Sequence, residues 1–309
     1  GDLVQSFYQL SKQIYDMENP REVRRALIFC MRAWLHRTKM RHLDAFFRKD
    51  PILKELAEIY PFVYEQPTRA FFYNKSTFDD RVRLVEAHMQ FLRENICEDI
   101  FLGLYRRDPI MLWSGLECMG EPMTATLFFE PGQRKEGLLS VILRLGSASL
   151  YQIIFWIAPA EDGTPAMWIG AMQGPNMGNA RDVVKVVTKA CHSYRTKNLV
   201  LYIAQAVART LRLGHIYAVT NEGYYANNHI RLDRKLKTDF GAFWEEVGGW
   251  ETDDRRFYEL PLVYPRKTME EVPTRKRAVY RRRFAFLDAL DEEIETSMGR
   301  LLKDVGEKT

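Results

Sequence analysis

The sequence predicts an α+β protein in which a helical N-terminal region packs on a mixed sheet with flanking helices and a long C-terminal helix. The chain has 309 residues, about twice a typical domain length, and its 46% apolar and 13% aromatic content excludes a disordered protein. Near residue 120 the pattern changes from helical spacing to apolar segments separated by turns. We therefore expect a helical region at 1–118, a sheet domain at 119–268 and a C-terminal helix at 269–309.

The first region has the pattern of several short helices. Apolar residues recur at helical spacing, for example at Val23, Ala26 and Cys30, and residues 78–95 give the clearest helical pattern. Proline is disfavoured inside a helix, so the prolines of this region mark helix boundaries. They stand at positions 20, 51, 61 and 67.

The second region begins with the pattern of an antiparallel meander, because its apolar segments are joined by short turns such as Gly146-Ser147. The predicted strands are residues 124–129, 138–145, 151–158 and 166–172. After them we expect helices at 182–194 and 198–213, a strand at 215–220, a helix at 240–247, a strand at 257–263 and a helix at 269–303. Antiparallel strands followed by helix, strand, helix and strand resemble the core of the GNAT acyltransferases. The predicted sheet is therefore GNAT-like.

The loop after the fourth predicted strand is a candidate phosphate-binding loop. It contains Gln173, Gly174, Asn176 and Gly178 and leads into a predicted helix. Glycines before a helix let backbone N–H groups approach a phosphate. GNAT enzymes bind the pantetheine-pyrophosphate of their acyl donor here with a Gln/Arg-x-x-Gly-x-Gly/Ala pattern, and this chain has Asn176 at the middle glycine. The alternative is an ordinary strand-to-helix turn.

A second candidate anion site is the start of the next predicted helix. Arg195 and Lys197 would place two cations beside the N-terminal helix dipole, and Asn198 lies next to them. The alternative interpretation is a plain turn between two helices. Lys185, Lys189 and His192 form a polar stripe on the preceding helix, which either binds an anionic cofactor or faces solvent.

Candidate catalytic residues leave the predicted strand 215–220. In an acyltransferase core these residues face the acceptor, so Glu222 is a candidate general base and Tyr224 or Tyr225 a candidate general acid. Asn221 and His192 complete the candidate catalytic set. The alternative is that Glu222 is simply a solvated residue in a turn.

Two segments carry most of the positive charge, although the whole chain has a net charge of only +4. Residues 21–49 contain nine Lys and Arg against two acids, a local charge of +7, and residues 275–283 contain six and no acid. The first segment interleaves Arg with Trp34, so it fits either an anionic membrane surface or a helix with a buried apolar face. No groove-reading or stacking motif accompanies the charge, which disfavours nucleic acid. The second segment places cations at a helix start, so we expect acidic protein surface or an anionic ligand there.

The remaining features favour a cytoplasmic protein, with peripheral attachment to the inner membrane as a further option. No apolar run approaches the length of about 18 to 20 residues that a membrane helix needs, and the first residues lack the layout of a signal peptide. The four cysteines form no CxxC pair, which indicates reduced thiols without a zinc ligand set. The sequence leaves the oligomeric state open.

Several ordered segments resemble the VirK/YbjX family. They are residues 83–88, 173–174, 188–192, 219–222, 243–249 and 276–283. Two departures are Gly223-Tyr224-Tyr225, where the family usually has a histidine, and Thr196, where it commonly has proline. The resemblance implies a Gram-negative bacterial protein connected with envelope integrity, surface display of virulence factors and resistance to cationic antimicrobial peptides. It implies membrane association but no particular reaction.

Two functions follow as hypotheses. The first is an acyltransferase with no tightly bound cofactor, which moves an acyl group from acyl-CoA or the phosphopantetheine of an acyl-carrier protein to an envelope-related lipid, peptide or small molecule. The second is a non-catalytic factor that binds the membrane surface through residues 21–49.

Overall fold

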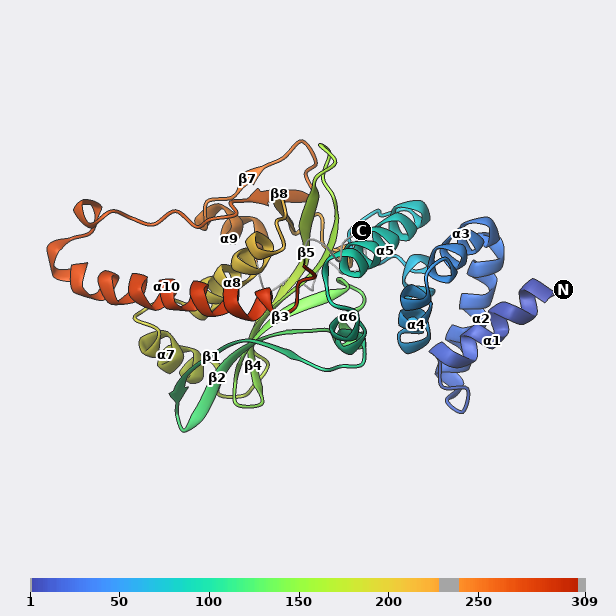
Figure 1. Ribbon diagram of the computed structural model, residues 1–309, viewed down its shortest axis with the longest axis horizontal. Coiled ribbons are helices and arrows are strands. Elements are labelled where there is room, and N and C mark those ends of the chain that lie inside the picture. The colour runs from blue at the N-terminus through green and yellow to red at the C-terminus, as the bar shows by residue number, and fades with distance from the viewer. Residues whose placement is uncertain (1, 228–238, 305–309) are drawn as a thin grey trace.

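The computed structural model describes residues 2–227 and 239–304 and confirms the α+β class (Figure 1). Six helices of the N-terminal half gather at one end of the molecule. They are α1 (Asp2–Ile14), α2 (Pro20–Leu35), α3 (Arg37–Arg48), α4 (Pro51–Ile59), α5 (Phe78–Asn95) and α6 (Glu98–Tyr105). The other elements are the sheet and the helices that flank it. One continuous apolar core runs from the N-terminal helices into the sheet.

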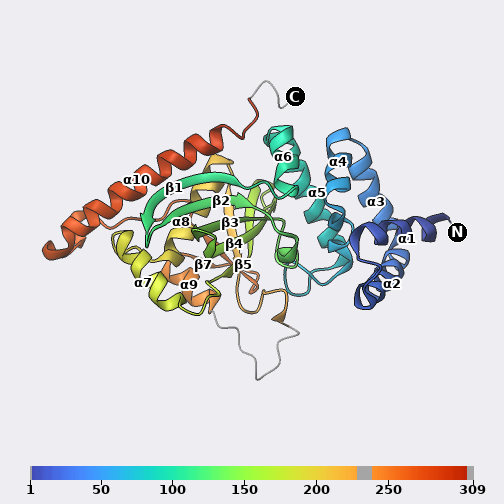
Figure 2. The ribbon, with the colours of Figure 1, turned by 90° about the horizontal axis from the view of Figure 1, so that it is seen from below.

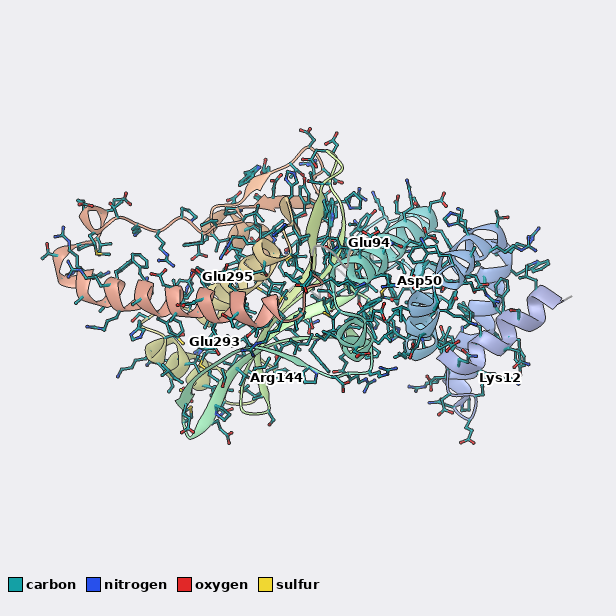
Figure 3. The ribbon with its side chains drawn as sticks, in the orientation of Figure 1. Lys12, Asp50, Glu94, Arg144, Glu293 and Glu295 are labelled. Atoms are coloured by element: carbon teal, nitrogen blue, oxygen red, sulfur yellow. The ribbon has the colours of Figure 1, made fainter. Side chains whose placement is uncertain are left out.

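Prolines mark the starts of α2 and α4, as the sequence predicts, and a polar cap precedes each of them. Asn19 accepts a hydrogen bond from the N–H of Arg21 at the start of α2, and Asp50 accepts two from the first turn of α4. Each cap is followed by the proline that forms the first residue of the helix, where the missing N–H costs nothing. Asp50 also pairs with Arg93 of α5 at 2.9 Å, so one cap fixes the position of two helices. Figure 3 shows Asp50 among the N-terminal helices.

The sheet has eight strands in the order β1-β2-β3-β4-β5-β6-β8-β7. They are β1 (Ile110–Cys118), β2 (Glu121–Phe128), β3 (Leu139–Leu145), β4 (Ala148–Pro159), β5 (Pro165–Gln173), β6 (His215–Val219), β7 (Trp250–Glu251) and β8 (Phe257–Leu260). Strands β2 to β5 form the predicted antiparallel meander, and β1 adds a fifth antiparallel strand to it. Strand β6 runs parallel to β5, and β8 is antiparallel to β6.

Strand β1 is an element that the sequence did not predict, since it lies within the range expected to be helical. Its pairing with β2 shifts register twice, between Met111 and Trp113 and between Ser114 and Glu117. These bulges break the alternation of buried and exposed residues by which a strand is recognised in a sequence. The division of the chain at residue 118 stays a prediction.

Four helices flank the sheet: α7 (Ala180–Ala190), α8 (Thr196–Thr210), α9 (Phe240–Glu246) and α10 (Arg277–Gly299). Helix α10 contacts α8 and β1 and lies far from α1 and α2 (Figure 2). It buries Leu287, Leu290, Ile294 and Met298, which share one face. The helix is shorter than the predicted 269–303, because two 3-10 turns separated by Pro273 precede it.

The chain returns at its end to the junction of α5 and α6. The N–H of Cys97 donates to the carbonyl of Leu301 at 2.9 Å, and that of Lys303 donates to Asn95 at the same distance. Ile96 and Leu302 form a β-bridge between these bonds. No helix within the described residues is long and apolar enough to cross a membrane.

His88 of α5 connects the N-terminal helices to the centre of the sheet. Its Nδ1 accepts the N–H of Ile157 in β4 at 3.0 Å, and its Nε2 donates to the hydroxyl of Tyr105 at 2.9 Å. That hydroxyl donates to the carbonyl of Leu138 at 2.6 Å. Burial lowers the pKa of His88 to about 3, so the ring is neutral at physiological pH.

Replacing His88 with leucine should leave the buried N–H of Ile157 without an acceptor. We expect His88→Leu to lower the free energy of unfolding by about 2–3 kcal/mol, from the cost of an unsatisfied buried donor and the lost hydrogen bond to Tyr105. Urea unfolding at pH 7.5 measures this change. His42→Leu is the matched control, because His42 is an exposed histidine bonded to Glu86. Equal effects of the two substitutions would contradict the linking role of His88.

Candidate functional site

The candidate site lies where β5 separates from β6. The two parallel strands pair from Ala166–His215 to Ile169–Ala218. Strand β5 then continues to Gln173 without a ladder partner on that side among the described residues. On its other side, β5 has a bulge at this point, since Ile154 pairs with Ala171 but Phe155 with Ile169. The extra residue is Gly170. Bulges are common beside functional sites because they redirect side chains.

Gly170 must be a glycine because another part of the main chain rests on it. A Cβ at this position would lie 1.9 Å from the carbonyl oxygen of Glu136 and 2.9 Å from the ring of Trp156. The segment that contains Glu136 is held against β4 by the N–H of Leu138, which donates to Phe155 at 2.9 Å. The bulge and this segment together fix Glu136 over the end of β5.

The carboxyl group of Glu136 accepts two hydrogen bonds. Nε2 of Gln173 donates to one oxygen at 2.6 Å, and the hydroxyl of Tyr224 donates to the other at 2.8 Å. Gln152 of β4 donates to Gln173 at 2.9 Å and in turn accepts a bond from Gln133. We call these five side chains the Glu136 network.

Burial raises the pKa of Glu136 to about 7, although the bonds from Tyr224 and Gln173 act in the opposite direction. The residue is only 5% exposed, so desolvation of the charged form dominates. A carboxyl group with a pKa near the working pH exchanges a proton readily in both directions. Glu136 is therefore the group in this site best suited to general acid–base chemistry.

A segment of the N-terminal half holds Tyr224 in place. The N–H of Asn74 donates to Gly223 and its side chain donates to Glu222, both at 2.9 Å. Arg256 binds the carbonyl of Asn74 at 3.0 Å from the other side. These bonds fix the loop after β6, and Tyr224 therefore reaches Glu136.

The structure brings Gln173 and Tyr225 to this site. Gln173 belongs to the Glu136 network, a role different from the predicted phosphate loop. Tyr225 lies edge-on to Phe71, with ring centres 6.2 Å apart. Its pKa is raised by burial and by the nearby Glu136.

The rest of the predicted phosphate loop is exposed. Neither Asn176 nor Gly178 has a positive φ, so neither position uses the left-handed conformation that favours glycine. A Cβ at Gly178 would meet nothing within 4 Å, whereas one at Gly174 would contact the ring of Tyr151. The fold therefore does not require a glycine at position 178.

Arg195 of the second predicted anion site pairs with Glu246 of α9. Burial raises the pKa of Tyr151, against which Gly174 packs, and the positive charge of Arg195 opposes this shift. Lys197 lies 4.5 Å from the ring centre of Phe243, and burial lowers its pKa. The side-chain oxygen of Asn198 is buried without a hydrogen-bond partner among the described residues.

Three predicted catalytic residues lie outside the contacts of Glu136. Asn221 accepts the N–H of Phe240 at 2.9 Å. The exposed side chain of Glu222 lines a pocket of about 350 Å³ with the acidic Asp239. His192 stands in the turn between α7 and α8, and its ring faces Phe286 of α10 with centres 5.8 Å apart.

Sequence reasoning missed Glu136 and Gln152. Gln152 gave a signal, because it is a single polar residue inside the apolar segment 150–158, and a buried amide needs a partner. Glu136 gave none, because it follows Arg134 and Lys135 in a charged turn.

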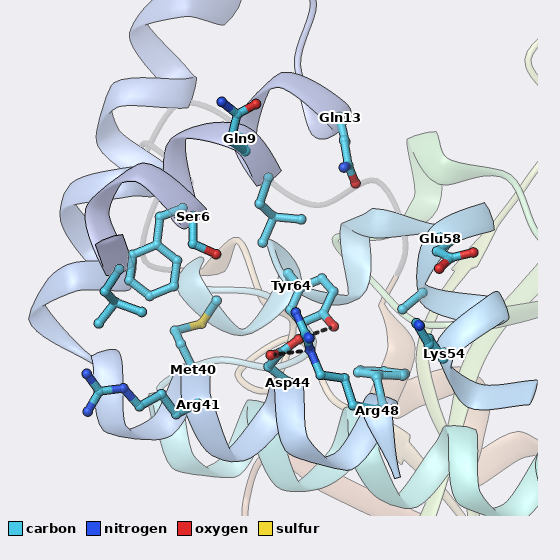
Figure 4. Close-up of a pocket in the computed structure, with 15 residues that line it drawn as sticks. Ser6, Gln9, Gln13, Met40, Arg41, Asp44, Arg48, Lys54, Glu58 and Tyr64 are labelled. Carbon is cyan, nitrogen blue, oxygen red and sulfur yellow. Dashed lines mark hydrogen bonds and ion pairs between the residues drawn. The ribbon is translucent and has the colours of Figure 1, made fainter. Parts of the chain in front are cut away.

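A separate pocket of about 300 Å³ lies among α1, α3 and α4 (Figure 4). Its wall contains both apolar and polar side chains, and Asp44 bonds there to both Arg48 and Tyr64. None of the predicted site residues lines it. Across the described parts of the chain, no three His, Cys, Asp or Glu side chains are grouped to hold a metal ion.

The fold and site define an α+β protein with an open mixed sheet and a buried, titratable carboxyl group at the end of a central strand. The chain belongs to the family described as "Protein of unknown function (DUF535)", which it matches over residues 18–296. Its similarity to the YbjX protein of Escherichia coli confirms the predicted relation to YbjX, and the predicted relation to VirK stays a prediction.

Similar proteins come from several bacteria. "Uncharacterized protein YbjX" of Escherichia coli K12 is 34% identical over 223 residues, which cover 70% of this chain and 67% of that protein. An uncharacterized protein of Haemophilus influenzae is 26% identical over 273 residues, 87% of each chain. "Membrane protein LapB" of Mannheimia haemolytica is 26% identical over 184 residues, 59% of this chain and 76% of that protein. No solved structure gives a significant match.

The raised pKa of Glu136 should appear as a pH dependence of stability. Its folded-state pKa lies above the ordinary value of 4.5, so its contribution is favourable below pH 4.5 and is lost as the pH rises to about 7. Between these values we expect Glu136→Gln to gain stability relative to the wild type, by up to about 3 kcal/mol, with no further gain above pH 7.

Urea unfolding of both proteins from pH 4.5 to 8 measures this difference. Glu222→Gln is the control, since it removes an exposed carboxyl group from the loop that carries Tyr224. A difference for Glu136→Gln that stays constant with pH would contradict the assignment. An identical pH dependence for Glu222→Gln would show that the effect comes only from the loss of one negative charge.

Proposed function

We propose that the protein is an acyltransferase that uses a thioester of phosphopantetheine, with Glu136 as its general base. The observation that carries this proposal is the buried carboxyl group with a pKa near 7, at the point where two parallel strands separate. The element order supports it. An antiparallel meander, then α7 and α8, then a parallel strand, then α9 and a returning strand resemble the GNAT core.

The free side of β5 suits the donor. Beyond Ile169, the described part of β6 offers β5 no further ladder bonds. A pantetheine arm contains two amides, which can pair with such an edge as an added strand does. Further along, the first turn of α7 has no side-chain cap. Burial raises the pKa of Tyr151, against which Gly174 packs, and the positive charge of Arg195 opposes this rise, so this cation is available to attract a pyrophosphate.

The proposed reaction uses Tyr224 to connect Glu136 with the substrate, because Glu136 is nearly inaccessible while Tyr224 is half-buried. The acceptor N–H or O–H gives its proton to the oxygen of Tyr224 as the hydroxyl proton of Tyr224 moves to Glu136. The acceptor atom bonds to the thioester carbon, and the carbon–sulfur bond then breaks. Tyr225 protonates the leaving thiolate and is reprotonated from Glu136 through solvent. The products are the acylated acceptor and the free thiol.

An acyl-carrier protein is an alternative form of the donor. Arg283 of α10 donates to the carbonyls of His192 and Ser193, so the protein's own backbone compensates this cation. Arg275, Lys276, Arg281 and Arg282 are exposed on the same segment and suit an acidic carrier surface.

The test separates donor binding from turnover. We expect native mass spectrometry of the full chain to show one bound acyl-CoA. The rate of thiol release, measured with a panel of amine acceptors, should fall about 100-fold or more in Glu136→Gln while acyl-CoA binding is retained. Tyr224→Phe should give a similar loss, and Glu222→Gln should stay active. A phosphopantetheinylated carrier protein is tested in parallel.

Two outcomes would exclude the proposal. One is that no thioester from two to sixteen carbons binds on either carrier. The other is that Glu136→Gln releases thiol as fast as the wild type.

Helix α2 favours a second candidate function, peripheral binding to an anionic membrane. Residues 21–49 were expected either to face a membrane or to bury an apolar face, and α2 has apolar residues on both sides. Ala26, Phe29 and Ala33 are buried, while Leu27, Met31 and Leu35 are 58%, 55% and 65% exposed. Trp34 extends the exposed face, and Arg37 lies 4.7 Å from its ring centre. A relative that carries the name "Membrane protein LapB" is consistent with this function.

Liposome flotation tests the second function. We expect binding to vesicles that contain phosphatidylglycerol, and we expect high salt or the double substitution Leu27→Ser/Leu35→Ser to abolish it, because apolar insertion and charge act together. Val263→Ser is the control, since Val263 is 64% exposed at another place. Unchanged flotation of the double variant would exclude this surface.

A further inference from the structure

A row of mostly aromatic side chains crosses the sheet and passes β5 at Trp168, five residues before Gln173. Trp156 of β4 pairs with Trp168 of β5, which pairs with Tyr217 of β6. Tyr217 pairs with Glu259 of β8, which pairs with Trp250 of β7. These five cross-strand neighbours therefore lie side by side on one face. We call them the aromatic row.

One end of the aromatic row is covered and the other is open. Phe72 and Tyr73 pack on Trp156, which is 2% exposed. Trp168 and Tyr217 are half-buried and stacked, with ring centres 4.3 Å apart, and Trp250 is 49% exposed. Because Trp168 stacks between Trp156 and Tyr217, and Tyr217 stacks between Trp168 and His215, the ring that is most accessible at the open end is that of Trp250.

A pocket of about 470 Å³ lies over this open end. Trp168, Tyr217 and Trp250 line it together with Phe257, whose ring stands edge-on to Trp168 at 5.0 Å. Its volume is within the range of small-molecule sites, roughly 300–1,000 Å³.

The charge around this pocket has one sign. No Lys or Arg lines it. Its lining holds five carboxyl groups, those of Glu161, Glu251, Asp253, Asp254 and Glu259. Asp254 is bound by Arg256 at 2.8 Å, and Glu259 by His215 at 3.0 Å. Among the residues that the structure describes, the other three form no ion pair.

We propose that this pocket binds a small organic cation with an alkylammonium group. The quadrupole of an accessible tryptophan ring such as that of Trp250 attracts cations, and desolvated ammonium groups gain most from such contact. The three carboxyl groups without a basic partner add Coulomb attraction and select against anions. An alkyl chain on the ligand contacts Trp168 and Phe257, and its ammonium group lies near Trp250 and Asp253. The inference does not depend on acyl transfer, because it concerns binding alone.

The experiment is calorimetric titration of the full chain with choline and with spermidine. Choline has a neutral analogue of the same shape, 3,3-dimethylbutan-1-ol, which isolates the contribution of charge. We expect at least one of the two cations to bind and the analogue not to bind. Comparison of choline with spermidine shows whether the site prefers quaternary or primary ammonium groups.

Variants then locate the site. We expect Trp250→Leu to weaken binding about tenfold, the loss of one favourable cation–π contact, and Asp253→Asn to weaken it to a smaller extent. Both residues are exposed, so the fold should tolerate the changes. Trp34→Leu is the matched control, because it removes an exposed tryptophan from α2.

Three results would overturn the proposal. They are the absence of binding by either cation at millimolar concentration, equal binding of the neutral alcohol, and equal weakening by Trp34→Leu. Circular dichroism shows whether each variant is folded. If Trp250→Leu does not fold, Asp253→Asn still tests the proposal.

Discussion

The contact between the main chain of Glu136 and Gly170 is the constraint on which the site depends. Because Gly170 has no side chain, the segment before β3 can lie directly on the bulge of β5. That position places the carboxyl group of Glu136 within reach of Gln173 and Tyr224 while excluding water. Any side chain at position 170 would lift the segment away, and the raised pKa, the hydrogen bonds and the burial would be lost together.

The fold could be predicted largely from local signals. Pro20 and Pro51 mark the starts of two helices, and the turn at Gly146 has the positive φ that favours glycine. The elements that were missed lack such signals. Strand β1 has two bulges that remove the period of two, and β7 consists of only two residues. Pro273 and the turns beside it shortened the predicted C-terminal helix.

The candidate site was predictable only in part. The strand-to-helix position of Gln173 and the loop of Tyr224 were both identified, since each follows a recognisable strand. Their common partner was not, because Glu136 and Tyr224 are 88 positions apart and meet only through the sheet order. A pKa near 7 arises from burial by distant parts of the chain, whereas the sequence around Glu136 describes an ordinary charged turn.

The closure of the α5–α6 junction by the last described residues has a consequence for biosynthesis. The sulfur of Cys97 and the carbonyl of Leu302 that it contacts are separated by 205 positions. At roughly 5–20 residues per second, the ribosome needs about 10–40 seconds to make the intervening chain. During that interval the N–H of Cys97 and the carbonyl of Asn95 have no backbone partner. The N-terminal helices thus emerge first, but their junction with the sheet is completed only when translation of the described chain is almost over.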